Sequence, residues 1–275
     1  QVGPMLPSYP TKYPVVELQA GDVDAPAAHQ PNAHVMNDWL ASSHARAGVN
    51  CSACHQDKEQ RAWTDHPEPR ACATCHTSQF QGFVAGRHGM RAATPFGLMS
   101  VAEARLPMKT SAADGHVSCT TCHGAHSFDT SEAQAEACLG CHADEHSMAW
   151  RHSPHGQLAS GTDQAVTCAT CHMPRVRQRD STFDVSWTAV EHNQSDTLRP
   201  NEKMIRPVCL NCHGLAFAID ALADPELIRR NFTGTPNRHV PSLDMAETRL
   251  REHESRMSNN GERSDEHYIG AVVRI

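Results

Sequence analysis

The sequence predicts a mostly α-helical protein with extensive loops and little or no sheet. Aromatic residues make up 5% of the 275 residues, the mean hydropathy is −0.53, and Leu, Ile and Val are sparse. Side chains of this composition form only a small apolar core, so another group has to fill much of the interior. Helix-start signals recur along the chain, whereas runs that alternate in the manner of strands are nearly absent.

All twelve cysteines fall into six units of the form C-x-x-C-H. The units, numbered motifs one to six in chain order, are Cys51-Cys54-His55, Cys72-Cys75-His76, Cys119-Cys122-His123, Cys138-Cys141-His142, Cys168-Cys171-His172 and Cys209-Cys212-His213. In c-type haem attachment the two thiols add to the haem vinyl groups, and the adjacent histidine lies under the iron as its proximal ligand. The pattern therefore predicts six covalently bound c-type haems, held by the twelve cysteines and the six motif histidines.

Three other uses of paired cysteines fit this pattern less well. Zinc ribbons contain C-x-x-C pairs but do not need a histidine directly after each pair. Disulfide frameworks do not repeat one spacing, and a thioredoxin-like C-x-x-C occurs once, near a βαβ pattern. Because every cysteine belongs to a unit that ends in histidine, haem attachment is favoured.

Six further histidines are needed if every iron has two axial imidazoles, and fourteen histidines lie outside the motifs. The predicted distal ligands are His44, His88, His126, His146, His155 and His192. His126 and His146 lie three and four residues after a motif histidine, so each can reach a neighbouring iron but not the same one. Gly86 and Gly89 flank His88 and are expected to allow close approach of a haem.

Other side chains stay open as ligands. The reserve histidines are His66, His116, His152 and His239. A methionine ligand would raise the potential of its iron, and the candidates are Met90, Met108, Met148 and Met173. No residue is assigned a catalytic role.

The distribution of the motifs predicts three segments. Residues 1–31 contain six prolines and are expected to form an extended arm. Residues 32–214 are expected to form a hexahaem-binding body, and residues 215–275 a haem-free C-terminal helical tail. The first cysteines of successive motifs lie 21, 47, 19, 30 and 41 residues apart. The short gaps are expected to hold adjacent haems in motifs one and two, and in motifs three and four.

Three local patterns predict helix ends within and after the body. Asn32 is expected to cap a helix over residues 33–46. Ser131 and Gln134 form a capping-box pattern, so motif four is expected to end a helix. Asp224 followed by a proline indicates another helix start.

The tail carries a longer helical pattern. Leu243, Ala246, Leu250, His253 and Met257 follow a 3-4-3-4 spacing, which predicts a helix that ends near residues 259–261. The apolar face of this helix is expected either to pack against the haem-binding body or to form a subunit contact.

Charge and the predicted cofactor indicate the compartment and the partners. No stretch of the sequence is apolar for long enough to span a membrane, and the chain begins at Gln1, as expected of an exported protein whose signal peptide is removed. Covalent haems are loaded after translocation, so a periplasmic or extracellular location is expected. The formal charge is −7. Six ferric haems with ionised propionates would bring it to about −13, which disfavours nucleic acid and favours redox partner proteins.

The segment from Trp39 to His44, leading through Val49 to motif one, resembles multihaem cytochromes of the hydroxylamine oxidoreductase and octahaem cytochrome superfamily. The segments 150–156, 168–174 and 206–214 carry the same resemblance. It implies a mostly α-helical scaffold with haems in stacked and perpendicular pairs, and activity on small nitrogen or sulfur compounds at one open haem.

The sequence departs from that superfamily at three points. It has six motifs where the typical enzyme has eight. Its only tyrosines are Tyr9, Tyr13 and Tyr268, all in the terminal segments, whereas the oxidising enzymes crosslink a tyrosine to the catalytic haem. A C-x-x-C-K motif is also absent from the sequence.

Electron transfer along closely spaced, mainly bis-histidine haems is therefore the expected function. One alternative is an oxidoreductase that acts on a small nitrogen or sulfur compound at one open haem. A second alternative is a subunit of a conducting filament, in which copies of the chain bind one another.

Overall fold

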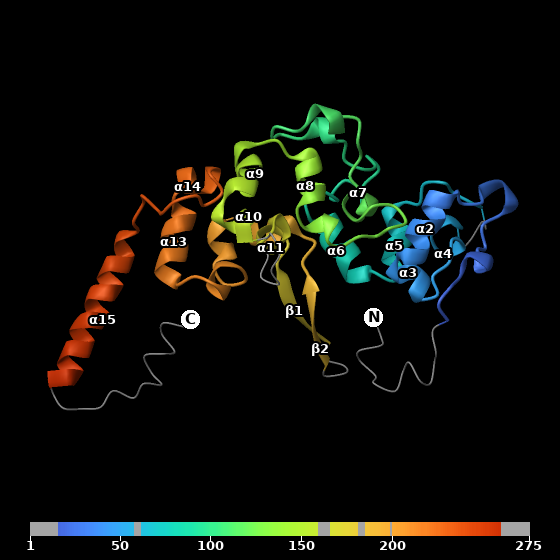
Figure 1. Cartoon of the computed structure of the whole chain (residues 1–275). Helices are drawn as coiled ribbons and strands as arrows, with labels where there is room; N and C mark the ends of the chain where they lie inside the picture. The colour runs from blue at the N-terminus through green and yellow to red at the C-terminus, as the bar shows by residue number, and fades with distance from the viewer. Residues whose placement is uncertain (1–15, 58–61, 159–165, 181–184, 199, 260–275) are drawn as a thin grey trace. The chain divides into compact units, whose positions relative to one another are not determined.

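The computed structural model describes residues 16–57, 62–158, 166–180, 185–198 and 200–259. About half of the chain is helical, and the described residues contain a single two-stranded sheet, so the predicted mostly α-helical class is confirmed (Figure 1). Most of the helices are short, and loops join them. Within the described residues, no helix is both long and apolar enough to cross a membrane.

The elements follow one another in this order. The α-helices are α2 (Ala33–Ala41), α3 (Ser43–Arg46), α4 (Ser52–His55), α5 (Pro69–Ala73), α6 (Thr77–Ala85), α7 (Cys119–His123), α8 (Glu136–Cys141), α9 (Glu145–Ala149), α10 (Pro154–Leu158), α11 (Cys168–His172), α12 (Gln194–Leu198), α13 (Leu215–Ala223), α14 (Pro225–Arg229) and α15 (Pro241–Asn259). Single 3-10 turns cover Ala20–Asp22, Ala27–His29, Val101–Glu103, Thr110–Ala112, Glu132–Gln134, Trp150–His152, Asn201–Met204 and Cys209–Asn211. The strands are β1 (Arg175–Asp180) and β2 (Val185–Val190), which pair antiparallel.

The chain divides into two compact units. Unit 1 comprises residues 1–144 and 167–197, and unit 2 comprises residues 145–166 and 198–275. Motifs one to five belong to unit 1 and motif six belongs to unit 2. The division into arm, body and tail stays a prediction.

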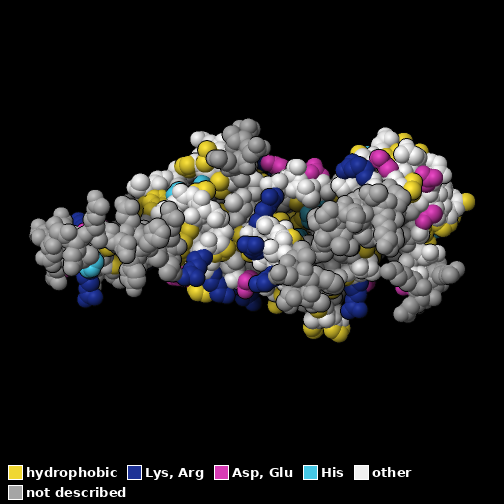
Figure 2. All heavy atoms as spheres, turned by 90° about the horizontal axis from the view of Figure 1, so that it is seen from below, with side chains coloured by type: hydrophobic (Ala, Val, Ile, Leu, Met, Phe, Trp, Pro, Cys, Tyr) yellow, Lys and Arg dark blue, Asp and Glu magenta, His cyan; other side chains and the backbone are white. Residues whose placement is uncertain are grey.

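The apolar core is small, as the composition predicts. The buried apolar side chains include Trp39, Phe83, Leu139, Trp150 and Leu227. Hydrophobic side chains also lie scattered among polar and charged ones on the face that Figure 2 shows. Side chains alone therefore fill little of the interior.

The predicted helix over residues 33–46 is wrong at one position. Asn32 caps α2 as expected, because its side chain accepts a hydrogen bond from the Val35 N–H. The helix ends at Ala41, however, since Ser42 is extended and its hydroxyl oxygen accepts hydrogen bonds from the first N–H groups of α3. A serine inside a helical pattern has become the cap of a second helix.

The predicted capping box before motif four is also wrong. Ser131 makes no side-chain cap, and a 3-10 turn over residues 132–134 is separated from α8 by Ala135, which has φ −146°. Motif four still ends a helix as predicted, because α8 ends at Cys141.

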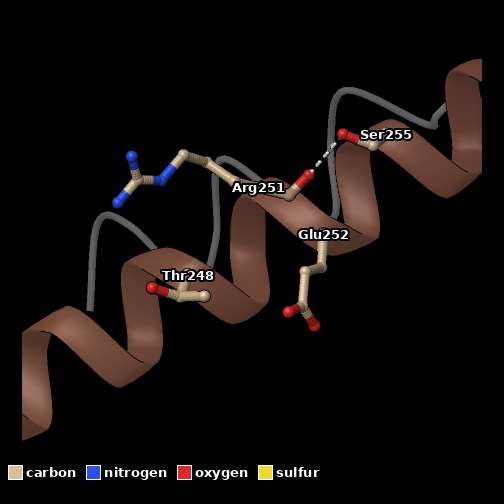
Figure 3. Close-up of a pocket in the computed structure, with 4 residues that line it drawn as sticks. All are labelled: Thr248, Arg251, Glu252 and Ser255. Atoms are coloured by element: carbon tan, nitrogen blue, oxygen red, sulfur yellow. Dashed lines mark hydrogen bonds between the residues drawn. The ribbon is translucent and has the colours of Figure 1, made fainter.

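The helix starts and ends of the tail are confirmed. The Asp224 side chain accepts hydrogen bonds from the N–H groups of Glu226 and Leu227, with a proline at the first position of α14. The last helix, α15, ends at Asn259. A hollow on α15 is lined by Thr248, Arg251, Glu252 and Ser255 (Figure 3). All four residues come from one helix and none is a predicted ligand, so the candidate sites lie elsewhere.

Candidate functional site

Each C-x-x-C-H motif forms one helical turn. The N–H of the histidine donates to the carbonyl of the first cysteine at 2.8–2.9 Å in motifs one, two, four and six. Motifs three and five are themselves the helices α7 and α11. Residues three apart share one face of a helical turn, so the two thiols of each motif are presented on the same side.

Five motif histidines each face a histidine from outside the motifs. The ring centres are 6.0 Å apart for His44–His76, 5.9 Å for His55–His126, 6.1 Å for His88–His142, 6.4 Å for His123–His192 and 6.0 Å for His155–His213. In every pair, the histidine from outside the motifs is one that the sequence predicts as a distal ligand.

This spacing fits two axial ligands on one metal ion. Two metal–nitrogen bonds of about 2.0 Å, with about 1.1 Å from each nitrogen to its ring centre, separate the two ring centres by about 6.2 Å. Among the residues that the structure describes, no group of three or more His, Cys, Asp or Glu side chains lies close enough to hold a metal ion. The candidate ligands meet in pairs, as a planar macrocycle between them requires.

The two other predicted ligands, His146 and His172, belong to different units, and their roles stay predictions. The four reserve histidines, His66, His116, His152 and His239, are exposed. Of the methionine candidates, Met90 and Met148 are about half exposed, at 54% and 49%.

Backbone carbonyls orient several of the paired rings. The Nδ1–H of His55 donates to the Thr64 carbonyl at 2.8 Å, and that of His192 donates to the Val190 carbonyl at 3.0 Å, when the proton is assigned to Nδ1. This tautomer leaves Nε2 as the lone-pair nitrogen, which is the arrangement typical of metal-bound histidine. Trp63 also stacks on the His55 ring, with centres 5.1 Å apart and planes 12° apart.

Burial keeps the paired rings neutral. It is the main cause that lowers the pKa of His44, His88, His123, His126 and His155, and the paired histidine lowers it further in four of these five. For His126 that partner is His55, and for His155 it is His213. A neutral imidazole is the form that ligates a metal ion.

Glycines next to His88 make room for protein. A Cβ atom at Gly86 would lie 2.6 Å from the Gln194 side chain and 3.2 Å from the His192 carbonyl, and one at Gly89 would lie 2.4 Å from the Phe83 carbonyl. Both glycines therefore let α6 and the following turn pack closely against neighbouring backbone. The expectation that they serve haem approach assigned them another role.

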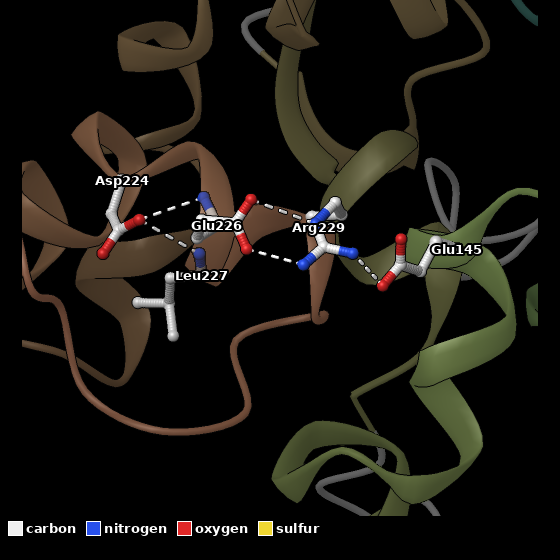
Figure 4. Close-up of polar contacts among 5 residues, drawn as sticks. All are labelled: Glu145, Asp224, Glu226, Leu227 and Arg229. Atoms are coloured by element: carbon white, nitrogen blue, oxygen red, sulfur yellow. Dashed lines mark hydrogen bonds and ion pairs between the residues drawn. The ribbon is translucent and has the colours of Figure 1, made fainter.

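In unit 2, charged side chains join α9 to α14 (Figure 4). Arg229 binds both carboxylate oxygens of Glu226, at 2.6 and 3.1 Å, and also binds Glu145 at the start of α9. The Nδ1 of His146, on α9, lies against the carbonyl of Ile228 on α14. The pair of helices thus fixes the His146 ring.

The first five motifs contact one another in chain order. Helix α4 of motif one packs against α5 of motif two, and α7 of motif three packs against α8 of motif four. Across the long gaps, the Cys119 thiol donates to Cys72, which lowers the pKa of Cys72 to about 7, and the Cys138 thiol donates to Cys168, which lowers the Cys168 pKa. The long gaps therefore bring motifs together as the short gaps do.

No protein-family model matches the chain, so the resemblance to the hydroxylamine oxidoreductase superfamily stays a prediction. Sequence reasoning also missed the aromatic neighbours of the paired rings. Trp63 follows motif one by eight residues, and Phe128 lies edge-on to His44 with ring centres 4.3 Å apart. An aromatic residue a few positions after a C-x-x-C-H unit was the available signal for both.

Proposed function

We propose that this chain is a hexahaem c-type cytochrome that transfers electrons in a periplasmic or extracellular space. The observation that carries the proposal is the set of five histidine pairs. Each pair joins a motif histidine to a predicted distal ligand, at the separation that an iron between them requires.

In this proposal, the two cysteines of each motif form thioether bonds to one haem, and the motif histidine binds its iron. The ligands from outside the motifs are His126 for motif one, His44 for motif two, His192 for motif three, His88 for motif four and His155 for motif six. Bound haem supplies a one-electron centre whose potential depends on its axial ligands, burial and hydrogen bonds.

The surrounding residues hold the ligands in place. The carbonyls of Thr64 and Val190 orient the rings of His55 and His192. Neutral, partly buried imidazoles bind without first losing a proton. Two strong axial ligands on an iron also leave no position for a substrate, which favours electron transfer over catalysis at five of the six sites.

The order of the motifs supports conduction. Motifs one to five follow one another through helix packing and thiol contacts, so an electron at one site has a neighbouring site before or after it in the chain. We infer a relay in chain order within unit 1, with redox partner proteins as donor and acceptor.

The test is to express the chain with a cytochrome c maturation system and to count haems by pyridine haemochrome after denaturation. We expect six covalent haems per chain and a low-spin ferric spectrum. Four or fewer haems on fully matured protein would contradict the proposal. Enzyme-like turnover of nitrite, hydroxylamine or sulfite, together with a high-spin signal in the untreated protein, would favour the oxidoreductase alternative.

A further inference from the structure

One local pattern occurs twice in the chain. Tryptophan is followed three residues later by serine and five residues later by a predicted distal ligand, as Trp39, Ser42 and His44 and again as Trp150, Ser153 and His155. A valine then precedes the first cysteine of the next motif by two residues, at Val49 and at Val166. One copy lies in unit 1 and the other in unit 2.

The two copies form the same hydrogen bonds. In each, the serine hydroxyl donates to the tryptophan carbonyl, at 2.6 Å for Ser42 and 2.8 Å for Ser153. The tryptophan Nε1–H donates to the valine carbonyl at 3.1 Å in both.

The serine oxygen also accepts from the backbone at the distal ligand. Ser42 accepts from the N–H groups of His44 and Ala45 at 3.2 and 3.4 Å. Ser153 accepts from the Gly156 N–H at 3.1 Å. The hydroxyl therefore ties the end of one helical segment to the first turn of the next, which carries the ligand.

Burial makes these hydrogen bonds costly to lose. Ser42 is 3% exposed and Ser153 is 0% exposed, and both tryptophans are buried. A buried hydroxyl without a partner destabilises a fold by about 1–3 kcal/mol. The space is also tight, because a Cβ atom at Gly156 would lie 2.0 Å from the Trp150 carbonyl.

The ligands of the two copies have similar surroundings. His44 and His155 each face a motif histidine at 6.0 Å with steeply crossed rings, at 87° and 69°. Each also lies edge-on to a phenylalanine with positive φ, Phe128 at 48° and Phe232 at 58°. The same hydrogen-bonded unit thus presents the same kind of ligand twice.

We propose that the Trp–Ser unit, Trp39 with Ser42 and Trp150 with Ser153, is a duplicated positioning device that sets the ring orientation of a distal haem ligand. Ser42 and Ser153 are its positioning residues, acting through His44 and His155. The inference rests on the proposed function, because the orientation matters only when both imidazoles bind one iron. The indole N–H of each copy also fixes the carbonyl just ahead of the next motif.

Ring orientation has a spectroscopic readout. Ferric low-spin haems with crossed imidazole planes give electron paramagnetic resonance signals with a large maximum g value, whereas near-parallel planes give rhombic signals. The 87° and 69° pairs belong to the first class, and the His55–His126 pair, at 6°, belongs to the second. A change at Ser42 or Ser153 should therefore move a signal of the first class alone.

The test compares Ser42→Ala and Ser153→Ala in the fully matured holoprotein, with Ser43→Ala as control. Ser43 is the exposed neighbour of Ser42, and its hydroxyl binds Arg46. In each of the first two variants we expect six haems, with one large-g signal shifted or converted to high spin and the rhombic signal unchanged. The control should match the wild-type spectrum.

Two outcomes would overturn the inference. One is an unchanged spectrum in both variants. The other is loss of the haem itself, because the hydroxyl would then serve folding or attachment instead of ligand orientation. A wild-type protein that carries no covalent haem would count against the proposed function, and the haem count separates that failure from the other two.

Discussion

At the residue scale, the ligand set was easier to predict than its pairing. The sequence identified His44 and His126 because glycines, helix ends and motif spacing surround them. It could not show that His44, seven residues before motif one, faces His76 of motif two. Nor could it show that His126, just after motif three, faces His55 of motif one. Pairing depends on how the loops return, and no local pattern records that path.

A single substitution tests one assignment. Replacing His155 with Ala should leave six haems attached, because the cysteines of motif six are untouched, and should convert one iron to high spin. His152→Ala is the matched control, since His152 lies three residues away and is exposed. Optical and electron paramagnetic resonance spectra provide the measurement. An all-low-spin spectrum for the His155 variant would show that another residue ligates the iron of motif six.

At the element scale, the helix signals that held were those with a proline or a capping side chain at a true chain turn. Asn32 and Asp224 both cap as predicted. The signals that failed, at Ser42 and Ser131, involved serines inside helical patterns. Whether such a serine caps a new helix or stays in the old one depends on tertiary partners, such as the Trp39 carbonyl.

The Asp224 cap predicts an acid-sensitive segment in unit 2. Hydrogen bonds from the N–H groups of Asn237, Leu227 and Glu226 lower the pKa of Asp224 below its ordinary value of 3.8. A carboxyl with a lowered folded pKa stabilises the fold above its unfolded pKa, and this contribution is lost as the pH falls through the folded pKa. We therefore expect α14 to loosen below about pH 4.

Amide hydrogen exchange at α14, corrected for its intrinsic pH dependence, measures this effect. Asp224→Asn should exchange faster than wild type near neutral pH and should show a flatter response to acid. Glu202→Gln, at an exposed carboxylate of the same unit, serves as the control. Equal acid responses of the wild type and the Asp224 variant would contradict the prediction.

At the scale of the whole molecule, composition predicted the fold class because it limits the core. Few aromatic and branched apolar residues leave short helices, loops and a small set of buried side chains. The hairpin of β1 and β2 had no strong sequence signal, since Arg175, Arg177 and Arg179 alternate with other residues but face solvent. The two compact units were also not predictable, because unit 2 is assembled from two separate stretches of chain.

Axial ligation predicts the redox range of the holoprotein. Two imidazole ligands give an iron a lower potential than histidine with methionine does, and five of the six sites have a histidine pair. A spectroelectrochemical titration should therefore place most centres well below a His/Met cytochrome. A majority of strongly positive centres would show that methionines such as Met108 replace the assigned histidines.

The small core also predicts that the chain depends on its haems to fold. A chain of this length with so little buried apolar surface gains too little from burial to offset its conformational entropy, and the haems would supply the missing apolar contacts. We expect the haem-free chain, made without a maturation system and kept reduced, to show weak helical circular dichroism and rapid proteolysis. The matured chain under the same conditions is the control. A haem-free chain that unfolds cooperatively, with helix content equal to that of the matured protein, would show that the side chains suffice.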